Sequence, residues 1–106
     1  MATRKDALLQ FLAADPDDAF TRYALALELI AEGARTEGVA ELRETLRRSP
    51  AYVPGWHMLG QALATDGARE EAEAVYREGI AAARATGDTH AASEMQQELD
   101  ELQDDA

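Results

Sequence analysis

Few residues of this chain have the types and spacing that catalysis or metal binding requires. His57 and His90 are the only histidines, and the sequence contains no cysteine and no His-x3-His spacing. A metal site would need both histidines brought together with a carboxylate. Ser49 and Ser93 lie in no nucleophile motif, and no glycine-rich phosphate-binding loop occurs. We therefore expect a protein that is not an enzyme and that uses no metal or cofactor.

Acidic residues are the other side chains that could contribute a function. The net charge is −11, from 10 basic and 21 acidic residues, and it is concentrated in residues 87–106, which hold seven acidic and no basic residues. Nucleic acids and anionic membranes attract basic surfaces, so we expect neither as a partner. Two interpretations of the acidic segment stay open. It is a solubilising cap, or it is a docking surface for a basic partner.

The length and composition indicate one small helical domain over residues 1–106. Alanine occurs 23 times, and alanine, leucine, glutamate and arginine favour helices. No apolar run approaches the length of a membrane span. Residues 7–14 are apolar, but Asp6 precedes them and Gln10 interrupts them. This favours an amphipathic helix, with Leu8, Leu9, Phe11 and Leu12 facing a core, over a signal peptide. We therefore expect a cytoplasmic protein.

Glycine, proline and aspartate divide the rest of the chain into five predicted helices. Asp17 or Asp18 caps a helix that Gly33 ends, and Pro54 opens a helix that stops at Gly67. The other three predicted helices span residues 35–48, 68–85 and 89–102.

The chain matches itself when it is shifted by 34 residues. Asp15-Pro16 falls on Ser49-Pro50, Leu25-Ala26 on Leu59-Gly60, and Gly33 on Gly67, without a gap. Two helices and two short turns require about 34 residues, so the period indicates a repeated helix hairpin. The repeats span 19–52 and 53–86, with a half-repeat in 1–18 and a capping helix in 87–106.

The second repeat carries the landmarks of a known family. Trp56, Leu59 and Gly60, followed by Ala72 and Tyr76, resemble the tetratricopeptide repeat, in which Trp-x2-Leu-Gly is followed by a small residue and an aromatic residue. Several positions depart from that pattern. In the second repeat Leu63, Tyr76 and Arg84 replace its tyrosine, phenylalanine and proline, and the first repeat is looser, with Arg22 in the tryptophan place. The resemblance implies an all-α solenoid of about six helices in a right-handed superhelix.

The same resemblance implies a site. Tetratricopeptide proteins commonly bind partner peptides in a concave groove lined by the first helix of each repeat. The corresponding residues here are Phe20, Tyr23, Leu27, Ile30, His57, Gln61, Thr65 and Met95, with Glu98 beside them. An alternative is that Phe20, Leu27 and Ile30 only pack against the N-terminal helix. A clamp for a terminal carboxylate needs Lys or Arg on this surface, and none is present, so we expect no such clamp.

These observations predict a non-enzymatic module that binds a peptide or helix of a partner protein. The alternative is a structural protein that forms a homodimer through the same apolar surface.

Overall fold

The computed structural model describes residues 2–104, and six α-helices account for most of that part of the chain. No strand occurs among these residues, so the predicted all-α helical repeat is confirmed. Within the described range, no helix has both the length and the apolar composition needed to cross a bilayer. The helices are α1 (Arg4–Ala14), α2 (Ala19–Ala31), α3 (Arg35–Arg48), α4 (Val53–Thr65), α5 (Arg69–Ala85) and α6 (Thr89–Asp104).

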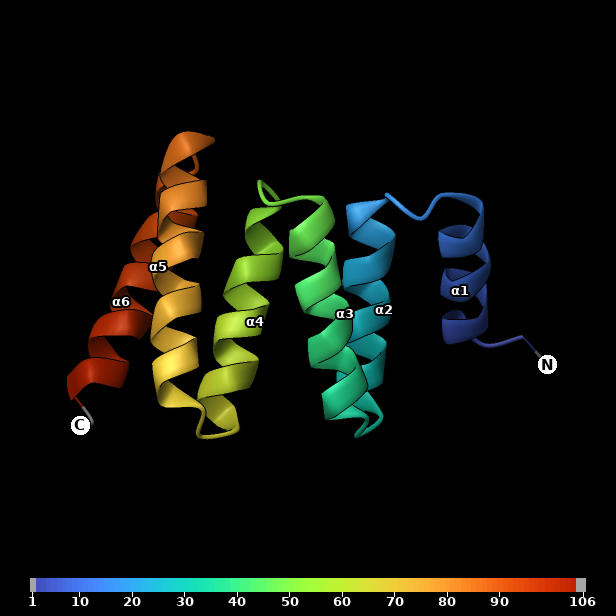
Figure 1. Ribbon diagram of the computed structural model, residues 1–106, viewed down its shortest axis with the longest axis horizontal. Helices are drawn as coiled ribbons and strands as arrows, with labels where there is room; N and C mark the ends of the chain where they lie inside the picture. The colour runs from blue at the N-terminus through green and yellow to red at the C-terminus, as the bar shows by residue number, and fades with distance from the viewer. Residues whose placement is uncertain (1, 105–106) are drawn as a thin grey trace. The chain divides into compact units, whose positions relative to one another are not determined.

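The chain forms two compact units, Met1–Ser49 and Pro50–Ala106. In the first unit, α2 and α3 form an antiparallel hairpin and α1 packs on α2 (Figure 1). In the second unit, α4 and α5 form the hairpin and α6 packs along α5 (Figure 1). Each unit therefore contains one complete helix hairpin and one additional helix.

Three glycines end helices as the sequence predicts. Gly33, Gly67 and Gly87 have φ angles of 89°, 79° and 78°, which side chains with a Cβ rarely adopt. At Gly33, the amide of Ala34 donates to Leu29 O at 2.8 Å and the amide of Gly33 donates to Ile30 O at 3.1 Å. The same pair of bonds recurs after α4 and α5. These bonds satisfy carbonyl groups that would otherwise have no partner at each helix end.

Aspartates cap two of the helices. Asp18 accepts a hydrogen bond from the Thr21 amide at 3.3 Å, and Asp88 accepts one from the Ala91 amide at 3.0 Å. A cap of this kind satisfies an amide of the first helical turn and fixes where the helix begins. Pro54 lies in the first turn of α4, where its missing N–H removes no helical bond.

Small residues let the paired helices approach closely. A Cβ atom at Gly38 in α3 would lie 2.6 Å from Ile30 Cγ1 and 3.1 Å from Ala26 O in α2. A Cβ atom at Gly60 in α4 would lie 2.5 Å from Cε1 of Tyr76 in α5. Both contacts are shorter than van der Waals separation, so each hairpin depends on the absence of a side chain at its glycine.

The prediction that the N-terminal helix turns four apolar residues toward a core is wrong for two of them. Leu12 is buried and Leu8 is half-buried, but Leu9 is 46% exposed and Phe11 is 65% exposed. A helix that contacts one neighbour buries only one stripe, and residues 9 and 11 lie outside the stripe through Leu8 and Leu12.

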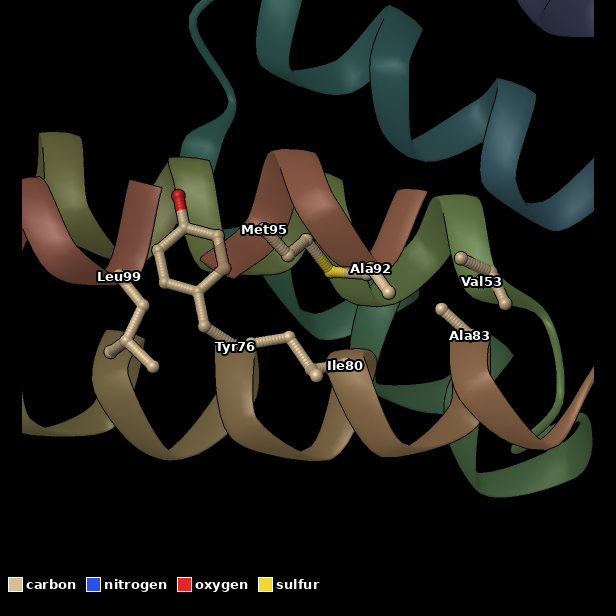
Figure 2. Close-up of a cluster of buried hydrophobic side chains, with 7 residues drawn as sticks. All are labelled: Val53, Tyr76, Ile80, Ala83, Ala92, Met95 and Leu99. Atoms are coloured by element: carbon tan, nitrogen blue, oxygen red, sulfur yellow. The ribbon is translucent and has the colours of Figure 1, made fainter. Parts of the chain in front are cut away.

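One cluster of the core of the second unit lies mainly between α5 and α6. Figure 2 shows its buried side chains, which are Val53, Tyr76, Ile80, Ala83, Ala92, Met95 and Leu99. Met95 has no exposed surface, and its sulfur would lie 2.6 Å from a Cβ atom at Gly79. The resemblance predicts Met95 on the partner-binding surface, whereas this side chain lies inside the core cluster.

The position of Met95 follows from a change in the repeat period. The starts of α2 and α4 are 34 residues apart, whereas the starts of α4 and α6 are 36 apart, because α5 is three residues longer than α3 and the connection before α6 is one residue shorter than the one before α4. Two extra residues rotate a position about 200° around a helix. A residue of α6 that a strict 34-residue period places on the groove therefore turns into the core.

Candidate functional site

The first unit places its predicted site residues along α2. Phe20 is 65% exposed, and Tyr23, Leu27 and Ile30 are half-buried. Burial raises the pKa of the Tyr23 hydroxyl above its usual value, so this phenol stays neutral at physiological pH. Ile30 also contacts the backbone around Gly38, so part of its surface belongs to the α2–α3 hairpin. The most exposed of these four apolar side chains is therefore Phe20, at the start of the helix.

The second unit brings together His57 and Gln61 of α4, Tyr76 of α5 and Glu98 of α6. Glu98 accepts hydrogen bonds from Gln61 Nε2 at 2.9 Å and from the Tyr76 hydroxyl at 3.1 Å. The imidazole Nε2 of His57 pairs with the other carboxylate oxygen of Glu98. We call these four residues the Glu98 cluster. His57 and Gln61 are one helical turn apart, which presents both to the same neighbour.

The Glu98 cluster holds its carboxylate in the ionised form. Burial disfavours the charged form of Glu98, but the hydrogen bonds from Gln61, His57 and Tyr76 outweigh it and lower the pKa of Glu98. The pKa of Tyr76 is raised strongly, by burial first and then by the negative charge of Glu98. The phenol therefore acts as a donor to a fixed carboxylate over the physiological range.

The raised pKa of Tyr76 predicts a loss of stability in alkaline solution. Above about pH 10 an unfolded tyrosine ionises while the folded one does not, so stability is fully present below that pH and falls as pH rises further. Between pH 8 and pH 11 we expect the free energy of unfolding to fall by about 1 kcal/mol less in Tyr76→Phe than in the wild-type protein. Urea unfolding between pH 8 and pH 11 measures it. Tyr23→Phe, which removes a phenol with a smaller shift, is the control and should recover less; equal recovery in both variants would contradict the prediction.

A cavity of about 420 Å³ adjoins the Glu98 cluster. Residues from α4, α5 and α6 line it, namely Gln61, Ala64, Thr65, Tyr76, Glu98, Glu101 and Leu102. The predicted site residues Gln61 and Thr65 thus lie at one cavity in the second unit. The other lining residues Tyr76, Glu101 and Leu102 are not among the predicted partner-binding residues. No signal in the sequence indicated that the Tyr76 hydroxyl donates to the Glu98 carboxylate.

The histidines form no metal site with their neighbours. His90 is exposed at the start of α6 and pairs with Glu94 at 2.8 Å. His57 pairs with Glu98 alone among the carboxylates recorded for it. Across residues 2–104, no group of three His, Asp or Glu side chains has the arrangement of a metal site.

Known proteins resemble this chain over most of its length. No family model matches it. A TPR repeat-containing protein of Pseudomonas aeruginosa is 29% identical over 85% of this chain and 86% of its own length. The cytochrome c-type biogenesis protein CycH of Rhizobium meliloti is 38% identical over 59% of this chain, which corresponds to 16% of that larger protein.

Solved structures also resemble this chain over most of its length. The solution structure of a tetratricopeptide repeat domain protein from Salinibacter ruber is 32% identical, with a TM-score of 0.79, and the match covers 83% of this chain and 89% of that one. A protein of Bordetella parapertussis is 28% identical, with a TM-score of 0.82, and the match covers 99% of this chain and 91% of that one. Tetratricopeptide repeats generally form protein-interaction modules rather than enzymes. On the strength of the repeat landmarks, the helix hairpins and these similarities, the chain belongs to the tetratricopeptide repeat family.

Proposed function

We propose that this protein is a non-enzymatic adaptor that binds a segment of a partner protein through the apolar side of α2. The observation that carries the proposal is Phe20, an aromatic side chain that is 65% exposed on the helix that also presents Tyr23, Leu27 and Ile30. Exposed apolar surface of this kind costs free energy in water and gains it when a partner covers it. Aromatic side chains are also frequent anchors of protein interfaces.

The expected occupant is a short segment with apolar anchor residues. The ionic groups that join α1 to α2 pair with each other, Arg4 with Glu28 at 2.8 Å and Lys5 with Glu32 at 2.8 Å. These pairs leave the apolar side chains as the main source of binding energy. Binding through such a surface should weaken little when salt is added, in contrast to docking on the acidic residues of α6.

The test compares two phenylalanines that have the same exposure in the same unit. Phe20→Glu places a charge on the proposed surface, and Phe11→Glu places the same charge on α1 at another 65% exposed position. Immobilised wild-type protein and both variants are used to capture proteins from a lysate, and the bound proteins are quantified by mass spectrometry. We expect one set of partners to be retained by Phe11→Glu and lost by Phe20→Glu.

The outcomes separate the adaptor from a structural homodimer. Partners retained equally by both variants would contradict binding through α2. A wild-type dimer in light scattering that Phe20→Glu converts to a monomer, without loss of any other protein, would assign the surface to self-association instead.

A further inference from the structure

The cavity beside the Glu98 cluster has a distinctive chemistry. It is open to solvent and about 420 Å³ in volume, which lies within the range of small-ligand pockets. One part of its lining is apolar, from Ala64 and Leu102, and another part is acidic, from Glu98 and Glu101. A ligand that fills it must therefore offer both an apolar stem and a polar or charged end.

The charge of the cavity is negative, because Glu98 and Glu101 of α6 line it and the described residues of its lining include no lysine or arginine. Neither α4 nor α6 contains a lysine or an arginine. Arg69, at the start of α5, pairs with Glu73 at 3.4 Å and donates to the Gln103 carbonyl at 3.5 Å. Glu98 is kept ionised by its three donors, as its lowered pKa indicates. An anionic ligand would be repelled here, whereas a cation would be attracted.

The geometry of the two carboxylates favours a particular cation. Glu98 and Glu101 are three residues apart on α6, so both face the same side of the helix. The planar guanidinium of arginine carries five N–H donors and can bridge two carboxylates, whereas the lysine ammonium is a single point charge. The aliphatic stem of arginine would lie along Ala64 and Leu102, as long cationic side chains do on apolar surface.

We propose that this cavity binds the side chain of an arginine presented by a protein partner. The inference extends the proposed function, because it rests on the chain acting as a protein-interaction module and adds a second, charge-selective contact. The cavity lies wholly within the second unit, so it can be tested apart from the apolar side of α2.

The first experiment titrates the ¹⁵N-labelled full chain with N-acetyl-arginine N-methylamide. We expect saturable shifts of the amides of Gln61, Thr65 and Leu102. The matched probe is the citrulline analogue, which has the same length and shape but no charge. Since a hydrogen bond between charged groups is stronger than a neutral one, we expect citrulline to bind at least about tenfold more weakly. Equal binding of the two probes would overturn the proposal.

The second experiment changes one carboxylate at a time. Glu101→Gln removes a charge at an exposed lining position that leaves the Glu98 cluster intact, and Glu98→Gln removes the charge inside the cluster. Glu94→Gln is the matched control, because it removes the same charge from α6 outside the cavity. We expect a loss of about tenfold or more in arginine affinity for each cavity variant and no change for the control. Equal losses in Glu94→Gln and Glu101→Gln would show nonspecific attraction to an acidic helix and would overturn the proposal.

The two proposals fail in different ways. If the arginine probe does not bind while Phe20→Glu still loses partners, the cavity proposal alone falls. If partner capture is insensitive to Phe20→Glu while the arginine probe still binds the cavity, the proposal about α2 alone falls.

Discussion

Gly60→Ala is expected to destabilise the second unit by about 1–3 kcal/mol, even though alanine favours helices more than glycine does. The added Cβ would lie 2.5, 2.8 and 2.9 Å from Cε1, Cδ1 and Cζ of Tyr76. The aromatic ring cannot move away at low cost, because Tyr76 is 2% exposed and its hydroxyl donates to Glu98. Urea unfolding followed by fluorescence measures the effect, since Trp56 is the only tryptophan and lies in this unit.

The first repeat supplies a matched control for this variant. Thirty-four residues before Gly60 and Tyr76, the same positions hold Ala26 and Leu42, both without exposed surface. Alanine is therefore accommodated at this position of a hairpin when leucine replaces the aromatic ring. We expect Gly60→Ala to be neutral, or stabilising by up to about 1 kcal/mol, in the Tyr76→Leu background.

The wild-type protein, Gly60→Ala, Tyr76→Leu and the double variant form a double-mutant cycle. The coupling energy between the two substitutions tests whether the ring causes the destabilisation. If Gly60→Ala costs the same in the wild-type and Tyr76→Leu backgrounds, then the ring does not cause the destabilisation. A coupling of about 1 kcal/mol or more would assign the glycine to the close approach of Tyr76.

Helix ends were predictable from sequence because single residues determine them. Gly33, Gly67 and Gly87 each end a helix within a residue of the predicted position, and Asp18, one of the two predicted capping residues, caps α2. A positive φ angle or a capping carboxylate acts locally, so it needs no knowledge of the neighbouring helices. The places of Gly60 and Tyr76 in the repeat were predictable from the repeat pattern, but their contact across the α4–α5 hairpin was not.

The orientation of α6 was not predictable in the same way. Its residues were assigned by extending a strict period of 34, but α5 continues to Ala85 and shifts α6 by two positions. The predicted helix over residues 68–85 already ends there, so the shift was present in the sequence, but the repeat register was extended without it. Met95 was therefore expected on the surface and lies in the core, and the contact of Glu98 with Tyr76 was not foreseen.

The sequence shows that Arg22 departs from the repeat pattern, but it does not show how its charge is accommodated. Arginine stands where the second repeat has Trp56, and it is 9% exposed. Its guanidinium donates to Glu41 Oε2 at 3.0 Å and to the Pro16 carbonyl at 3.0 Å, while its buried Nε has no hydrogen-bond partner. A cation in this position is costly unless its partners remain in place.

Glu41→Ala is therefore expected to cost more stability than Arg22→Met. Removing Glu41 leaves a buried guanidinium without its carboxylate, and we expect a loss of about 2–3 kcal/mol, scaled down from deeply buried pairs because the Glu41 side chain is 27% exposed. Arg22→Met removes the charge, keeps an apolar stem of similar length, and leaves Glu41 able to contact water. Its expected cost is below about 1 kcal/mol.

Urea unfolding by circular dichroism, together with hydrogen exchange of the α2 amides, measures the loss in the first unit. Glu37→Ala is the matched control, because it removes an exposed carboxylate from the same helix and should cost only about 0.5 kcal/mol. In the Arg22→Met background Glu41→Ala should cost little more than the control, since no buried cation remains to be stranded. If Glu41→Ala is instead as mild as Glu37→Ala in the wild-type protein, then water or the Pro16 carbonyl alone satisfies Arg22, and the pair contributes little to the stability of the α2–α3 hairpin.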